Sequence, residues 1–328
     1  MNRPALLSLP IVRRLALAVP VAGLALAAAV IPAGTASAAP VPGSLPNAEI
    51  AFQANTGSLW TWTPSGGTNL RLGMAAGTSP SINYNGEIAF QANTSSLWTW
   101  GPGGAGDLHL GMMAGTSPAI NGDWPHGAVA FQANTSSLWE AVPGCCGTDL
   151  RLGMMPGTSP AINDNGDIAF QANTGDLWAW GPNAPGATGL PMKAGTSPSI
   201  NDVGDVAFQG PHGHLWLWTG ISGDGPGQNT GLAMMAGTSP SLSSYDFNDD
   251  EVAFQGPHGY LWTWTPTGGG HDTGLPMKAG TSPSIDSLGD IAFQGPHGNL
   301  WITGPDSTYN TGLGMAAGTS PSITDPTG

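Results

Sequence analysis

Short apolar runs recur along the chain from residue 49 onward, and Gly-rich turns separate them. One copy of this pattern has four runs, at 79–82, 87–91, 97–100 and 107–112. Each run is too short for a stable helix, and its side chains alternate between two faces as they do in a strand. Since no window has the period of a helix, the hydrophobic pattern predicts β-strands only.

The same group of runs is repeated seven times. Every copy contains Ala-Phe-Gln, then Leu-Trp, a Gly-rich turn, a Met and Gly-Thr-Ser-Pro. Repeats of about 40 residues with four short strands are typical of propeller blades. The sequence therefore predicts an all-β fold, a seven-bladed β-propeller with four-stranded blades. The repeats lie near 49–86, 87–127, 128–166, 167–204, 205–250, 251–289 and 290–328.

The two ends of the repeat region complement each other. The region begins at 49–52 with a second strand that has no first strand before it, and it ends at 320–323 with a first strand that has no second strand after it. We therefore expect the C-terminal strand to complete the first blade and to close the ring without free sheet edges.

Aromatic residues occupy two fixed positions in the repeats. The Phe of Ala-Phe-Gln is present in all seven copies and is expected in the core. The Trp of Leu-Trp is also present in all seven, where it either packs between blades or offers a ring face to a sugar. These tryptophans are Trp60, Trp98, Trp139, Trp178, Trp216, Trp262 and Trp301.

A glutamine follows each core Phe. A buried amide must find hydrogen-bond partners, so each glutamine either fixes a nearby loop or turns toward a hydroxyl-rich ligand. These glutamines are Gln53, Gln91, Gln132, Gln171, Gln209, Gln255 and Gln294.

The turn between the second and third strands divides the blades into two classes. Blades one to four carry Asn-Thr, and blades five to seven carry Pro-His-Gly. In a propeller these turns share one face with the Gly-Thr-Ser-Pro connections, so this face combines amides, hydroxyls and imidazoles with nearby Trp. Such groups suit polyol recognition, although both sequences are also good turn formers. The candidate residues are Asn55, Asn93, Asn134, Asn173, His212, His258 and His297.

Composition and charge restrict the partners. The chain has 51 Gly and 30 Pro. It contains 7 Lys and Arg residues and 21 Asp and Glu residues, which gives a net charge of −14. An acidic protein repels phosphate backbones and anionic lipid, so nucleic-acid binding and membrane insertion are not expected.

The N-terminus predicts export. Arg13-Arg14 precede an apolar run at 15–31, and Ala36-Ser37-Ala38 matches a signal-peptidase site. We expect residues 1–38 to be a signal peptide and 39–48 a linker, with the mature protein secreted and extracellular. The general and twin-arginine routes both remain open. Cys145 and Cys146 are adjacent, so a bond between them would close almost no loop.

One stretch resembles a known family. Ser-Pro-Ser-Ile-Asn-Asp followed by Gly-Asp-Val-Ala-Phe, at 197–208, resembles the TolB-type propeller repeat. The Leu-Trp after a short turn is similar to bacterial seven-bladed propeller lectins and to tachylectin- or tectonin-like lectins. The resemblance covers about 49–328 and implies a propeller fold and carbohydrate binding.

Catalysis has little support, and a metal site is a minor expectation. Acids precede the Ala-Phe-Gln strand in six of the seven blades, one in each, which is typical of solvated or turn-capping positions and not of an acid–base pair. They are Glu49, Glu87, Asp167, Asp205, Glu251 and Asp290. No cofactor is expected, apart from calcium at 246–251 or, less completely, at 163–167.

The sequence therefore predicts a non-catalytic, lectin-like propeller that binds glycans or glycoconjugates through several weak sites on one ring. The alternative is a protein-interaction propeller for a secreted or cell-envelope protein.

Overall fold

The computed structural model describes residues 48–122, 127–182, 184–221, 225–243, 251–305 and 307–325. The predicted signal peptide lies outside this range. In the described part, no helix has the length and hydropathy needed to cross a membrane.

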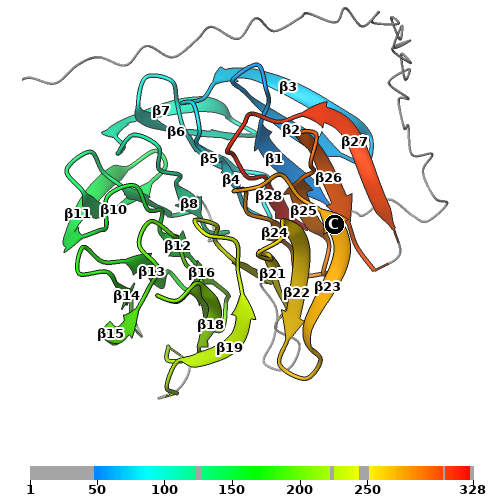
Figure 1. The fold of residues 1–328 in the computed structure, drawn as a ribbon. Helices are drawn as coiled ribbons and strands as arrows, with labels where there is room; N and C mark the ends of the chain where they lie inside the picture. Colours follow the sequence, from blue (N-terminus) through cyan, green and yellow to red (C-terminus); the bar gives the residue numbers. More distant parts are fainter. Residues whose placement is uncertain are drawn as a thin grey trace, which may run out of the picture. The chain divides into compact units, whose positions relative to one another are not determined.

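Seven antiparallel four-stranded sheets form the ring, so the prediction of a seven-bladed propeller is confirmed (Figure 1). The first strands of the blades contact one another in a circle around the centre. These innermost strands are β28 (Ser322–Thr324), β4 (Ser81–Ile82), β8 (Ala119–Ile120), β12 (Ala161–Ile162), β16 (Ser199–Ile200), β20 (Ser241–Leu242) and β24 (Ser284–Ile285).

The second strands carry Ala-Phe-Gln and are almost wholly buried. They are β1 (Glu49–Gln53), β5 (Ile88–Gln91), β9 (Val129–Gln132), β13 (Ile168–Gln171), β17 (Val206–Gln209), β21 (Val252–Gln255) and β25 (Ile291–Gln294). The third strands carry Leu-Trp. They are β2 (Ser58–Thr63), β6 (Ser96–Gly101), β10 (Ser137–Val142), β14 (Asp176–Trp180), β18 (His214–Trp218), β22 (Tyr260–Thr265) and β26 (Asn299–Thr303).

The fourth strands form the outer rim, and in each blade a register shift interrupts their pairing with the third strand. They are β3 (Gly66–Gly73), β7 (Gly104–Gly111), β11 (Cys146–Gly153), β15 (Gly186–Pro191), β19 (Gln228–Ala233), β23 (Gly269–Pro276) and β27 (Thr308–Gly314).

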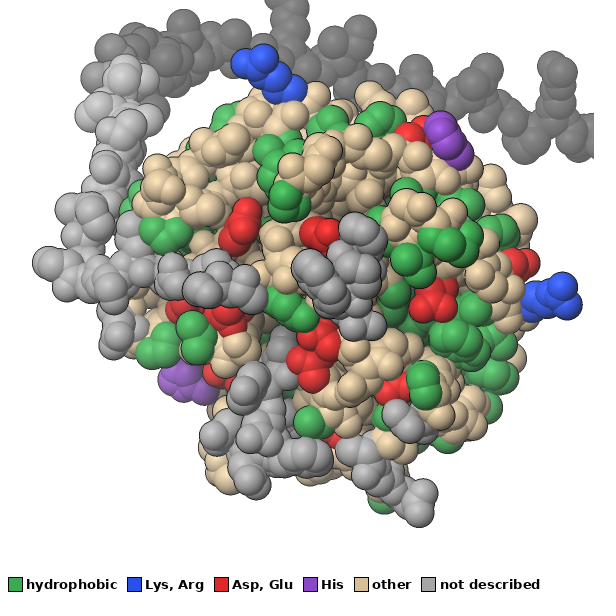
Figure 2. Space-filling view, turned by 180° about the vertical axis from the view of Figure 1, so that it is seen from behind, with side chains coloured by type: hydrophobic (Ala, Val, Ile, Leu, Met, Phe, Trp, Pro, Cys, Tyr) green, Lys and Arg blue, Asp and Glu red, His purple; other side chains and the backbone are tan. Residues whose placement is uncertain are grey.

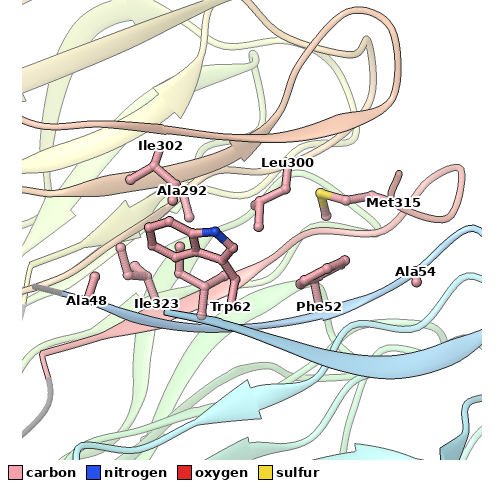
Figure 3. Packing of buried hydrophobic residues seen from close by; sticks show 10 residues of the cluster. Ala48, Phe52, Ala54, Trp62, Ala292, Leu300, Ile302, Met315 and Ile323 are labelled. Atoms are coloured by element: carbon pink, nitrogen blue, oxygen red, sulfur yellow. The ribbon is translucent and has the colours of Figure 1, made fainter. Parts of the chain in front are cut away.

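The C-terminal strand closes the ring as expected. β28 pairs antiparallel with β1, with Ile323 opposite Ile50 and Ser322 opposite Ala51. Figure 3 shows this junction, where Phe52 and Trp62 of the first blade pack against Leu300 of the seventh.

Each junction between blades repeats this packing. The Phe side of one second strand packs on the Ala and Leu side of the preceding blade, as Phe90 does on Ala51 and Leu59. All seven Phe side chains are fully buried, which confirms the predicted core. Burial of one such ring stabilises the fold by about 1.5–3 kcal/mol.

Candidate functional site

The predicted turn residues lie on one face, which we call the polar face; it consists of the second-to-third-strand turns and the fourth-to-first-strand connections. All seven side chains are exposed. They are Asn55, Asn93, Asn134 and Asn173 in the first four blades and His212, His258 and His297 in the last three. Each asparagine backbone N–H donates to the end of the preceding blade's outer strand, as Asn93 does to the carbonyl of Gly73 at 3.1 Å.

The seven glutamines lie beneath this face and are buried. Nε2 of Gln53 donates to the carbonyl of Ala75 at 2.9 Å, and the equivalent bond to the following connection recurs in every blade. In Gln132, Oε1 also accepts from the N–H of Gly157 at 3.0 Å. The glutamines thus fix the connections, and we leave them out of the sites proposed below.

The seven Leu-Trp tryptophans are half-buried between blades. Each ring is tilted against the Phe of its own blade, with centroids 6.1–6.4 Å apart. In Trp60, Trp98 and Trp139 the indole Nε1 is buried without a hydrogen-bond partner.

The Gly-Thr-Ser-Pro connections form a closed ring of hydrogen bonds, which we call the serine ring. The backbone N–H of each serine donates to Oγ of the serine in the next connection at 2.9–3.0 Å, and Ser320 completes the circle by donating to Ser79. The ring consists of Ser79, Ser117, Ser159, Ser197, Ser239, Ser282 and Ser320. The serine hydroxyls that the sequence pattern places on this face thus use their oxygens to join neighbouring blades.

The opposite face, formed by the first-to-second-strand turns, is acidic. In Figure 2, acidic side chains surround the middle of the face in view, and the Lys and Arg side chains visible there lie at its edge. The described acidic residues in or beside these turns are Glu49, Glu87, Asp164, Asp167, Asp202, Asp205, Glu251, Asp286, Asp290 and Asp325. The four described Lys and Arg residues lie elsewhere: Arg71 and Arg151 in outer strands, Lys193 and Lys278 on the polar face.

Some of these acids are buried, although solvated positions were one of the expectations for them. Asp167 and Asp205 are only 2% and 4% exposed, so they are not solvated. Burial raises the pKa of Glu49 and of Glu251, and it also raises the pKa of Asp202.

A pocket of about 470 Å³ opens at the centre of the acidic face. Its wall is a collar of isoleucines from the innermost strands, with amides and carboxylates beside them. We call it the central pocket. Among the residues that the structure describes, no Lys, Arg or His lines it. Its aliphatic residues are Ile82, Ile120, Ile162, Ile200 and Ile323, and its acids are Asp164, Asp202, Asp286 and Asp325.

The structure describes only one of the two expected calcium segments in full. Most of 246–251 lies outside the described residues. In 163–167, Asn163 Oδ1 accepts from the N–H groups of Asn165 and Asp167 at 3.1 and 2.8 Å, so it caps a turn. No three His, Cys, Asp or Glu side chains of the described ranges are placed to hold one ion.

A second pocket, of about 190 Å³, lies between the second and third blades. It brings Asn134 and Trp139, two residues predicted from the sequence, beside His109 of the preceding blade. His109 occupies a bulge with a φ of 56°, where blades four to seven have glycine, such as Gly189. A left-handed conformation costs a non-glycine residue about 1–2 kcal/mol. The same bulge carries Arg71 and Arg151 in two other blades. The sequence pattern alone did not identify His109 as part of this pocket.

Comparison with known proteins finds similar folds but no related sequence. No protein-family model matches the chain, and no curated protein matches it in sequence. A structure described as RRP9 WD40 repeats has a TM-score of 0.54 and 10% identity over 84% of this chain and 89% of that chain. The structure of U3-55K has a TM-score of 0.51 and 14% identity over 79% and 90%. The structure of BBS1N in complex with ARL6DN has a TM-score of 0.50 and 10% identity over 77% and 86%. At these identities the similarity shows the propeller fold alone.

Proposed function

We propose that this protein is a non-catalytic interaction propeller that binds a basic protein partner through its acidic face. The proposal rests mainly on the separation of charge, because the acids gather in the first-to-second-strand turns while the described Lys and Arg residues lie elsewhere. A surface of one charge steers a partner of opposite charge and orients it during encounter.

Two further observations support this proposal. The propeller offers a broad, rigid face, and one of the similar folds is described as BBS1N in complex with ARL6DN. The predicted signal peptide would place the interaction outside the cell, with a secreted or cell-envelope protein as partner.

A second candidate function is carbohydrate binding at the junction between the second and third blades. The unpartnered Nε1 of Trp139 and the amide of Asn134 could hydrogen-bond hydroxyls in that pocket. Ligand pockets usually measure about 300–1,000 Å³, so this smaller pocket would take only a small ligand such as one sugar ring. The TolB-like and lectin-like sequence resemblance favours the same candidate.

Capture with paired variants distinguishes the two functions. The immobilised protein is exposed to extracellular and envelope proteins of the source organism, and a captured protein is then purified and titrated. We expect one equivalent to bind. We also expect binding to be lost in the triple variant Asp164→Asn, Asp202→Asn, Asp325→Asn and retained in the double variant Asn134→Ala, His258→Ala. Capture that a free sugar inhibits, and that the polar-face variant abolishes, would instead support the lectin.

A further inference from the structure

A ladder of asparagine amides joins the blades on the acidic face. Nδ2 of Asn83 donates to the carbonyl of Asn121 at 2.8 Å, Asn121 to Asn163 at 3.1 Å, and Asn163 to Asn201 at 3.0 Å. These residues directly follow the innermost strands. The ladder satisfies a buried donor and a buried acceptor at each step.

Asp286 occupies the equivalent position in the seventh blade. Its Oδ1 caps the turn as the asparagines do, accepting from the N–H groups of Leu288 at 3.1 Å and Asp290 at 2.8 Å. Its Oδ2 therefore replaces the amide nitrogen, and an acceptor stands where the ladder has a donor. Within the described residues this oxygen accepts no N–H group, and Asp286 is only 2% exposed although it lines the central pocket.

Asp325 has the same imbalance in the adjoining first blade. Its Oδ2 accepts from the backbone N–H of Ser287 at 3.2 Å and from the Ser287 hydroxyl, while its Oδ1 is buried without a partner. Burial, and then the charge of Asp325, raise the pKa of Asp286 to about 8. The backbone N–H of Asp290 opposes this shift in the pKa of Asp286, whereas a side-chain hydrogen bond with Asp325 adds to it. The pair thus holds a proton up to about pH 8, and no positively charged side chain of the described residues lines the pocket beside it.

The walls of the central pocket indicate what kind of cation would fit. A bare metal ion needs several converging ligands, and no three suitable side chains converge in the part of the chain that the structure describes. The isoleucine collar offers apolar surface directly beside the carboxylates. A ligand with an aliphatic stem and a cationic end would contact both, as lysine and arginine side chains do.

We propose that the central pocket receives a lysine or arginine side chain of the partner protein, with its charged end at Asp286 and Asp325 and its stem against the isoleucine collar. This inference rests on the proposed function, because the side chain comes from the basic partner.

The test uses the ¹⁵N-labelled protein and the peptide acetyl-Gly-Lys-Gly-amide, followed by NMR titration. We expect saturable shifts around 286–290, with affinity increasing from about pH 6 to about pH 9 as Asp286 ionises. The carboxyl groups of Asp164 and Asp202 also line the pocket. The Nε-acetylated peptide has the same stem without the charge, and it should not bind.

Asp286→Asn is the decisive variant, because it restores the amide of the ladder and is expected to fold. Affinity for the lysine peptide should fall at least about tenfold. Asp149→Asn, the same change on an outer strand, should leave it unaltered. Equal binding by Asp286→Asn, or by the acetylated peptide, would overturn the inference.

The outcome also separates this inference from the proposed function. If the purified partner binds the acidic face but the lysine peptide does not bind the wild-type protein, the pocket proposal is wrong and the interaction proposal stands. If the peptide binds through Asp286 while the acidic-face variants keep the partner, the partner binds elsewhere: the proposed function fails, and the pocket accepts a cationic side chain that is not the partner's.

Discussion

The two faces of the propeller differ in how regularly their contacts between blades repeat. On the polar face the serine ring makes the same hydrogen bond at all seven junctions. On the acidic face the asparagine ladder runs from Asn83 to Asn201, and the later blades have Ser243, Asp286 and Thr324 instead. A contact made identically by every blade serves ring closure, whereas a position that departs from the repeat at a cost in stability is a better candidate for function.

Opening the ring should lower the free energy of unfolding most. It breaks the serine ring at Ser320 and also removes the inner strand of the first blade. Deletion of residues 320–328 exposes β1 along its edge and leaves the Ser282 N–H unpaired. We expect a loss of at least about 5 kcal/mol, comparable with the whole stability of many domains. Thermal unfolding followed by circular dichroism measures it. Deletion of 326–328 alone is the control, and a similar loss in both would show that strand closure is not the cause.

A single break in the serine ring should lower the free energy of unfolding by a smaller amount. Ser79→Ala removes the acceptor for the Ser320 N–H and is expected to cost about 1–3 kcal/mol in urea unfolding. Ser81→Ala is the comparison. Ser81 also accepts an N–H from the next blade, but its equivalents in the third and fourth blades are Ala119 and Ala161. The chain thus already tolerates the loss of this hydrogen bond in two blades. A greater cost for Ser81→Ala would contradict the importance given to the serine ring.

Fold and site could be predicted from the sequence to different extents. Blade number, strand positions and closure follow from patterns within about 40 residues, and all are confirmed. The serine ring joins residues far apart, 241 positions in the case of Ser320 and Ser79, so the motif alone did not reveal its use. The carbonyl groups that the glutamines bind likewise lie 21–26 residues away, so the motif alone did not reveal them. Alignment of the seven copies would have shown Asp286 in an asparagine position, but only the structure shows its oxygen buried without an N–H donor among the described residues.

Asp286→Asn should stabilise the acidic face. Because the pKa of Asp286 is raised from 3.8 to about 8, the folded protein retains a proton that the unfolded chain releases. Stability from this group is full below about pH 4 and is lost as the pH rises to about 8. The variant removes this loss, so its free energy of unfolding should exceed that of the wild type at pH 8.5. Melting temperatures across this pH range measure the difference, which should vanish near pH 4. A difference independent of pH would rule out titration as its origin.

Substitutions on the exposed polar face should have the smallest effect on stability. Asn93→Ala and His258→Ala remove exposed turn side chains and are expected to change the free energy of unfolding by less than about 0.5 kcal/mol. Partner affinity should also be unchanged. Loss of a sugar ligand in these variants, with the partner retained, would assign a separate carbohydrate role to the polar face.

Hydrogen–deuterium exchange in the complex with the purified partner tests the central claim most directly, since it compares both faces in one sample. We expect slower exchange in the first-to-second-strand turns at 83–87, 163–167 and 286–290, and unchanged exchange in the second-to-third-strand turns at 93–95 and 257–259. Protection confined to 93–95 and 257–259 would place the partner on the polar face and contradict the account.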